Sequence, residues 1–218
     1  MNSWERRDLA IVEADDFQDR YDRNGMNFLF YWKTKYPNFK ITLFTIPDRT
    51  SPELLRLISK HGDWIELGMH GFNHESNFEC WGWDEVKTNA YLDRVEKTDA
   101  YEKLFKAPGW QITDKYSGYN ADPDTAIGKD PLVVYRVLTQ RGYTIVDRHY
   151  NKPARPTDSK IICVDCNPQI VHMHTWDMET GDKAGRNGFR QVEEEQGVPW
   201  DNNTTFRFML RQDYICQE

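Results

Sequence analysis

Short apolar runs that end in polar residues alternate with amphipathic stretches along the chain. Such runs, rich in β-branched and aromatic residues, are typical of buried strands. The first spans Leu9 to Val12, and strands are predicted in the segments DLAIVEADDF, NFKITLFTIP, DWIELGMH, YTIVDRHY and QIVHMHTW. LFKAPGW indicates a strand end that breaks into a turn, and TTFRFMLRQ is either a last strand or a short helix.

The amphipathic stretches between these runs predict helices. The clearest helix begins after Ser51, a good N-cap, has Pro52 at its first position and ends near Gly62. A longer helix is expected from about Asp84 to Leu104, and another from Asp130-Pro131 to Arg141-Gly142.

Strands that alternate with helices predict an α/β fold with a mostly parallel sheet or barrel. No repeat or linker divides the sequence, so a single domain over residues 1–218 is expected. In such folds the active site lies at the C-terminal ends of the strands. Polar residues occupy these predicted ends at Asp15-Asp16, His70, Lys106, Asp147 and His174.

Composition excludes several classes of partner. The net charge is -7 and no basic run is present, which argues against nucleic acid. No segment approaches the roughly 20 apolar residues of a membrane helix, and residues 1–17 lack the apolar stretch of a signal peptide. A cytoplasmic protein without a membrane partner is therefore expected.

The four cysteines are too few and too irregularly spaced for a disulfide scaffold. Cys163 and Cys166 form a lone C-x-x-C pair, which could bind a metal or change redox state. Without a second pair, we interpret them as ordinary small residues in or beside a strand.

Two histidines and one carboxylate form a common set for holding a catalytic metal. His70 and His74 are four residues apart, and Gly71 with the preceding strand favours a loop rather than a helix between them. Asp15 and Asp16 are adjacent, so in an extended strand they point to opposite sides. One is therefore expected to bind the metal and the other to act nearby as a base.

His172 and His174 lie two residues apart on a predicted strand, so they share one face. Either could act as a general acid or donate a hydrogen bond to a backbone carbonyl, and the strand end favours the functional role for His174. Lys106 could orient a carboxylate, and the backbone N–H of Gly109 could face a developing oxyanion.

In chain order, these segments resemble the motifs of the polysaccharide deacetylase family, also called carbohydrate esterase family four. EADDF is similar to its strand ending in Asp-Asp, HGFNH to H-x-x-x-H, KAPGW to Arg-x-Pro, and HMH to Leu-x-His. The resemblance extends from Leu9 to about Leu210 and implies a distorted (β/α) barrel.

The resemblance also implies a divalent metal, usually zinc, held by Asp16, His70 and His74. By the same carry-over, Asp15 would be the general base and His174 the general acid.

Other members of the implied site are less direct matches. Lys106 would replace the arginine that orients the base, and Asp147 would be hydrogen-bonded to the general acid. The Gly109 amide would stabilise the oxyanion, while Trp110 and His172 would line the substrate site. His172 stands where the family has an apolar residue, so the acetyl pocket is expected to be more polar than usual.

The implied function is removal of acetyl groups from an N- or O-acetylated carbohydrate, by hydrolysis of carbon–nitrogen bonds other than peptide bonds in the N-acetyl case. Its partner would be a small-molecule or glycan substrate, on whose rings Trp81, Trp83, Trp110 and Trp176 could stack. Alternatives are hydrolysis of another amide, on a modified nucleotide or metabolite, and an inactive glycan-binding protein. A non-haem iron oxygenase ranks last, because it leaves Asp15 and His174 without roles.

Overall fold

A computed structural model describes residues 8–19, 22–110, 112, 132–148, 158–164, 169–174 and 200–210. The chain separates into two compact units. The first is drawn from Met1–Thr45, Arg49–Glu66 and Gln169–Gln212, and the second from Ile46–Asp48, Leu67–Pro168 and Asp213–Glu218. The single domain expected from the sequence stays a prediction.

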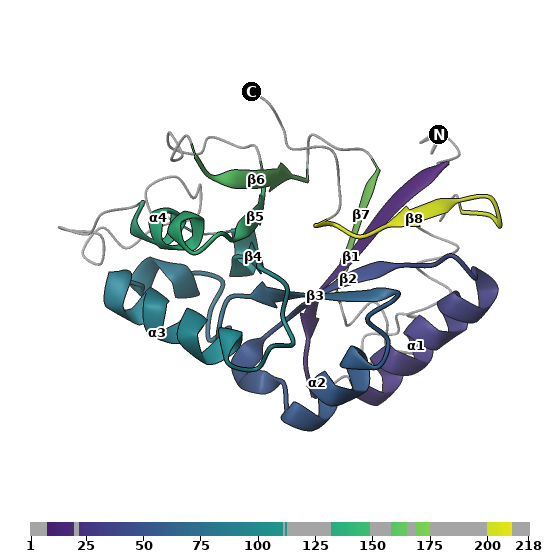
Figure 1. The fold of residues 1–218 in the computed structure, drawn as a ribbon, viewed down its shortest axis with the longest axis horizontal. Coiled ribbons are helices and arrows are strands. Elements are labelled where there is room, and N and C mark those ends of the chain that lie inside the picture. Colours follow the sequence, from purple (N-terminus) through teal and green to yellow (C-terminus); the bar gives the residue numbers. More distant parts are fainter. Residues whose placement is uncertain are drawn as a thin grey trace. The chain divides into compact units, whose positions relative to one another are not determined.

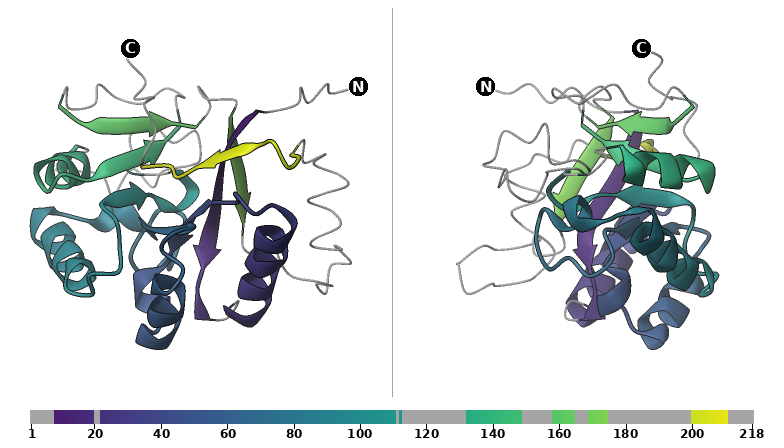
Figure 2. Two further views of the ribbon diagram at one scale, coloured as in Figure 1. Left: turned by 45° about the vertical axis from the view of Figure 1, so that its right-hand side comes forward. Right: turned by 90° about the vertical axis from the view of Figure 1, so that its left-hand side faces the viewer.

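The first unit is organised around β1 (Leu9–Phe17), in which every residue after Leu9 is buried. This strand pairs in parallel with β2 (Ile41–Thr45), β7 (Ile170–His174) and β8 (Thr205–Arg207). Figures 1 and 2 show β7 running alongside β1. The strand predicted at Leu9 to Val12 is thus confirmed but extends further, through both aspartates.

Among the described residues, the first unit contains the α-helices α1 and α2. α2 (Pro52–Ser59) begins as predicted, because the Ser51 hydroxyl accepts the backbone N–H of Leu54 at 3.2 Å. It ends before Gly62, at a C-cap formed by Lys60. α1 (Asp22–Lys35) was not predicted from the sequence.

An aromatic cluster forms much of the core of the first unit. Trp32 of α1 lies 5.0 Å from Trp200, and Phe39 lies 5.2 Å from Phe206 of β8, both measured between ring centroids. Edge-to-face pairs of this kind stabilise a core beyond the apolar area that they bury. Residues distant in sequence therefore tie α1 and β8 to the same unit.

The second unit contains most of β3 (Ile65–His70), which pairs in parallel with β4 (Leu104–Lys106). β4 in turn pairs with β5 (Thr144–Asp147), and β5 with β6 (Lys160–Cys163), again in parallel. Three of these strands end in the predicted polar residues His70, Lys106 and Asp147.

In the described part of this unit the α-helices are α3 (Glu85–Glu96) and α4 (Val133–Gln140). The predicted helix from Asp84 to Leu104 was too long at its end, because Asp99 takes a left-handed φ of 50° and Leu104 begins β4. The predicted start of α4 at Asp130-Pro131 lies outside the described residues. The core includes Met69, Trp83, Leu92, Phe105, Tyr135, Leu138 and Ile145.

The cysteines differ in state. Cys163 is the last residue of β6, which agrees with its expected place in or beside a strand. It is disulfide-bonded, so its interpretation as an ordinary small residue is wrong. Cys80 is a free, buried thiol, and burial raises its pKa well above the ordinary value. Cys166 lies outside the described residues.

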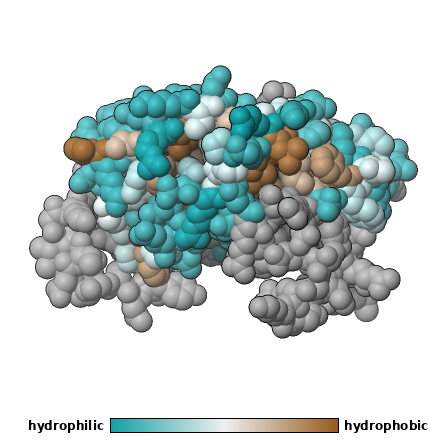
Figure 3. All heavy atoms as spheres, turned by 90° about the horizontal axis from the view of Figure 1, so that it is seen from below, coloured by the Kyte–Doolittle hydropathy of each residue, from teal (hydrophilic) through white to brown (hydrophobic). Residues whose placement is uncertain are grey.

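The molecular face in Figure 3 is mostly hydrophilic, with separate hydrophobic areas. Exposed large hydrophobic side chains in the described part of the chain include Phe30, Tyr31, Leu57 and Val86. Single exposed residues of this kind are normal on a protein surface. Within the same part, every helix is too short or too polar to cross a membrane.

Candidate metal and hydrolytic site

The two aspartates lie at the end of β1 in the first unit. Asp15 is 3% exposed and Asp16 is 7% exposed. The pairing of β1 with β2 is irregular between Ala14 and Phe17, and Asp16 takes a φ of 63°. This left-handed conformation departs from the extended geometry on which the expected division between the aspartates was based.

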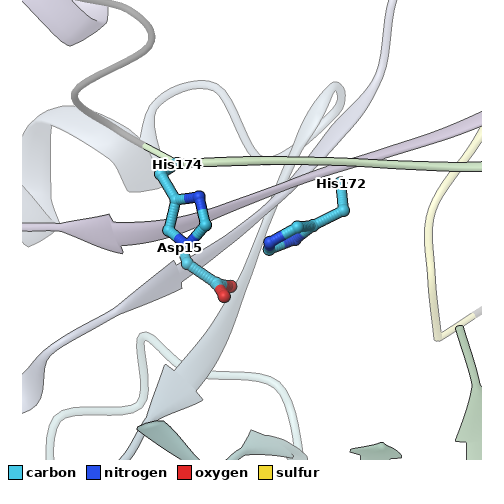
Figure 4. Close-up of side chains that lie close together, drawn as sticks. All are labelled: Asp15, His172 and His174. Carbon is cyan, nitrogen blue, oxygen red and sulfur yellow. The ribbon is translucent and has the colours of Figure 1, made fainter. Parts of the chain in front are cut away.

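The end of β7 brings two histidines beside Asp15. In the parallel register, Glu13 pairs with His172 and Asp15 pairs with His174. The two imidazole centroids are 4.7 Å apart, and the rings meet edge to face. Figure 4 shows the side chains of Asp15, His172 and His174 gathered on one side of these strands. The prediction that the two histidines share a face is confirmed.

Glu13 is a member of this cluster that sequence reasoning missed. Its carboxylate is fully buried, and Oε1 lies 2.7 Å from Nδ1 of His172. Because residues i and i+2 of a strand share a face, Glu13 could have been found as the acidic residue two positions before Asp15. Glu13 therefore adds a second polar group beside His172, the residue that was expected to make the acetyl pocket more polar.

In the second unit, His70 and His74 converge around a loop, as Gly71 indicated. Their ring centroids are 5.1 Å apart. Gly71 and His74 have φ values of 59° and 49°, so the segment is no helix. Nδ1 of the buried His70 lies 3.2 Å from the carbonyl oxygen of Lys106. A carbonyl only accepts, so Nδ1 donates in this contact, and in the neutral ring Nε2 would be the acceptor.

Glu79 organises this loop and was also missed. Its Oε1 accepts the backbone N–H of Phe72 at 2.9 Å and of Asn73 at 3.0 Å, and its Oε2 accepts that of His74 at 2.9 Å. The sequence carries little signal for this role, because the contact depends on the fold of the intervening loop. A carboxylate that accepts several N–H groups fixes a loop firmly.

Lys106 and Trp110 lie against each other in the second unit. Lys106 is fully buried, and its ammonium lies 3.9 Å from the Trp110 ring centroid. The Arg148 guanidinium carbon lies 4.9 Å from the same ring. Gly109 has a φ of 57°, and a Cβ there would lie 2.8 Å from Cβ of Asn77. The turn after β4 therefore requires glycine.

Asp147 is buried at the end of β5, where the Tyr135 hydroxyl donates to its Oδ2 at 2.5 Å and the Arg148 N–H donates to its Oδ1 at 2.7 Å. Tyr135 was not singled out from the sequence. The expected hydrogen bond between Asp147 and His174 stays a prediction.

The tryptophans considered for sugar stacking have different environments. Trp83 is 2% exposed and packs edge to face against Tyr91 and Phe105, so it is a core residue. Trp81 and Trp110 are partly exposed, and Trp176 lies outside the described residues. Most of the stacking expectation therefore depends on Trp81 and Trp110.

No protein-family model matches the sequence, and no curated protein matches it. Solved structures do match. The Xyl-CE4 domain of a multidomain xylanase from the hindgut metagenome of Trinervitermes trinervoides has a TM-score of 0.53 at 14% identity, covering 94% of this chain and 88% of that one.

A chitin deacetylase from the fungus Colletotrichum lindemuthianum has a TM-score of 0.53 at 14% identity, covering 93% and 86% of the two chains. A peptidoglycan N-acetylglucosamine deacetylase has a TM-score of 0.51 at 13% identity, with the same coverage. At such identities the likeness concerns the fold. The chain therefore has the distorted (β/α) barrel fold of the polysaccharide deacetylases, as its motifs predicted.

Proposed function

We propose that the protein is a metal-dependent hydrolase that removes acetyl groups from an N- or O-acetylated carbohydrate. The observation that carries this proposal is the convergence of His70 and His74, 5.1 Å apart between ring centroids, in a loop held by Glu79. The deacetylase fold and the order of the motifs along the chain support it. Fold alone does not fix function, so the argument depends on these residues.

The residues fit a divalent ion. His70 has its Nδ1 committed to the Lys106 carbonyl, an arrangement that fixes a metal-binding imidazole with Nε2 as the ligand atom. His70, His74 and the Asp16 carboxylate would hold the ion, and two nitrogens with one oxygen suit zinc. When bound, zinc would polarise the acetyl carbonyl and lower the pKa of water.

The remaining roles fall to the chain's own polar groups. The Asp15 carboxylate would take a proton from the attacking water, and the His174 imidazole would give one to the leaving amine or alkoxide. The Gly109 N–H would donate to the developing oxyanion. Lys106 would orient the base through its charge, and Asp147 would tune the acid.

One observation favours a second candidate. The pair formed by buried Glu13 and partly exposed His172 makes this side of the first unit polar, where the family resemblance places an apolar residue. A polar pocket suits a substituent other than a methyl group. The second candidate is therefore hydrolysis of another amide, on a modified nucleotide or metabolite.

The test uses the full chain, stripped of metal and then given one equivalent of zinc. Acetate release is measured from N-acetylglucosamine oligomers and acetylated xylan, beside amine release from a panel of other amides. We expect acetate release that depends on zinc and is lost in the double variant His70→Ala, His74→Ala. Amine release without acetate would select the second candidate, and glycan binding without any product would contradict both.

A further inference from the structure

We propose that the cluster formed by Asp15, His172 and His174 is a second divalent-metal site, which we call the β1–β7 site. It shares no ligand with the proposed catalytic ion. One carboxylate and two imidazoles favour zinc and related first-row metals over magnesium or calcium.

The strand register assembles the three ligands. β1 and β7 are parallel neighbours, with Asp15 opposite His174 and Glu13 opposite His172. Figure 4 shows the side chains of Asp15, His172 and His174 on one side of the two strands. Since alternate residues of a strand share a face, Glu13 lies on the same side, where it contacts His172. The site therefore lies wholly within the first unit, on two strands that hydrogen-bond to each other.

The spacing of the ligand atoms suits a metal. One atom from each of the three side chains lies within 4.8 Å of the other two. An ion about 2.1 Å from each ligand would hold these atoms roughly 3.5 Å apart. The ligand atoms therefore lie within about 1.3 Å of the separation that a bound ion would impose.

Glu13 prepares His172 as a ligand. An ionised carboxylate only accepts, so in a neutral His172 the 2.7 Å contact to Nδ1 would place the proton there and make Nε2 the ligand atom. Metal-binding histidines commonly hold a carboxylate in this way, and loss of that partner typically weakens metal affinity ~10–100-fold. Because Glu13 is fully buried, an ionised carboxylate there would attract a cation with little screening by water.

An ion can reach the site from the histidine side. Asp15 is buried, while the His172 side chain is 20% exposed and His174 is also partly exposed. His172, which stands where the family has an apolar residue, thus completes the set of three ligands. If the proposed function is correct, zinc bound here occupies both the base Asp15 and the acid His174, so the second ion inhibits hydrolysis.

Zinc per chain, measured by equilibrium dialysis and elemental analysis, tests the binding. We expect two ions in the wild type, one in His172→Leu, and one in the double variant His70→Ala, His74→Ala. His61→Leu is the matched control, because His61 belongs to the first unit but to neither ligand set, and it should keep two. Glu13→Gln should weaken binding of the second ion ~10–100-fold.

A variant could lose zinc because it fails to fold, so a second measurement uses the wild type alone. Imidazole 15N resonances of His172 and His174 should shift on a second equivalent of zinc. Unshifted resonances, or equal zinc content in wild type and His172→Leu, would overturn the β1–β7 site. Zinc lost from His172→Leu but not from the double variant would support this site and refute the proposed catalytic ion, so the two failures are distinguishable.

Discussion

The Glu79 carboxylate accepts the backbone N–H of His74 at 2.9 Å, and its other oxygen accepts the N–H groups of Phe72 and Asn73. One side chain thus sets the path of the loop that separates the two histidines. The geometry of the His70–His74 pair therefore depends on Glu79, which is not one of the proposed metal ligands.

Glu79→Gln should loosen this loop, because a neutral amide replaces two charged acceptor oxygens with one acceptor and one donor. We expect zinc affinity at the first equivalent to fall ~10–100-fold, measured by competition with a chromogenic chelator. Glu75→Gln, on the exposed part of the same loop, is the matched control and should leave affinity unchanged. Equal affinities in both variants would contradict the role assigned to Glu79.

Gly71→Ala should destabilise the fold by about 1–3 kcal/mol, measured by urea denaturation. Gly71 has a φ of 59°, and a Cβ there would meet the Glu79 carboxylate and Cγ of Pro108, the latter at 2.7 Å. Gly82→Ala provides the control, because nothing lies within 4 Å of its added Cβ. Similar losses of stability at both positions would show that neither the left-handed conformation nor the crowding at Gly71 matters.

Asp15→Asn should lower kcat by a factor of roughly 10²–10⁴, because an amide cannot take a proton from the attacking water. Zinc bound at the first equivalent should remain, since Asp16 is the proposed ligand. The measurement pairs acetate release with metal content in the same samples. Asp63→Asn, an exposed aspartate in the same unit, should keep full activity. Loss of the first zinc from Asp15→Asn would reverse the roles of the two aspartates.

The ion pair between Glu96 and Arg141 joins α3 to α4. We expect it to make a pH-dependent contribution to stability. Arg141 donates to both carboxylate oxygens of Glu96, at 2.6 and 3.3 Å, and these bonds lower the pKa of Glu96. The stabilisation is complete above the ordinary glutamate pKa and is lost as the pH falls through the lower pKa of the folded state.

Glu96→Gln should therefore cost about 1–2 kcal/mol at pH 7 and progressively less as the pH falls below the ordinary glutamate pKa of about 4.3. Urea denaturation across this range measures the difference from wild type. Glu53→Gln, which disrupts an exposed pair with Arg56, should change stability by less than about 1 kcal/mol at any pH. A cost for Glu96→Gln that does not vary with pH would refute this assignment.

Local pattern was enough to predict most elements of the fold. α2 begins where Ser51 and Pro52 indicated, and β3 delivers His70 at its end. These features depend on neighbouring residues, so a linear reading finds them. α1 was missed, and α3 was predicted too long because the turn at Asp99 has no glycine or proline to mark it.

Candidate site residues were predictable wherever a strand end carried an unusual side chain. His70, Lys106, Asp147 and His174 are the last residues of their strands in the structure, and Asp15 lies two residues before the end of β1. Two residues that hydrogen-bond to these candidates or to their loop were not predictable. Tyr135 reaches Asp147 from a helix, and Glu79 reaches His74 across a loop.

By itself, the sequence determined most of the strand and helix order and the residue types available for metal binding and proton transfer, because both are properties of short segments. Only the tertiary structure decided which of these residues meet. The parallel register of β1 and β7 placed Glu13 beside His172 and Asp15 beside His174, although about 160 residues separate the partners. Such register depends on packing across the whole unit, which no local pattern encodes.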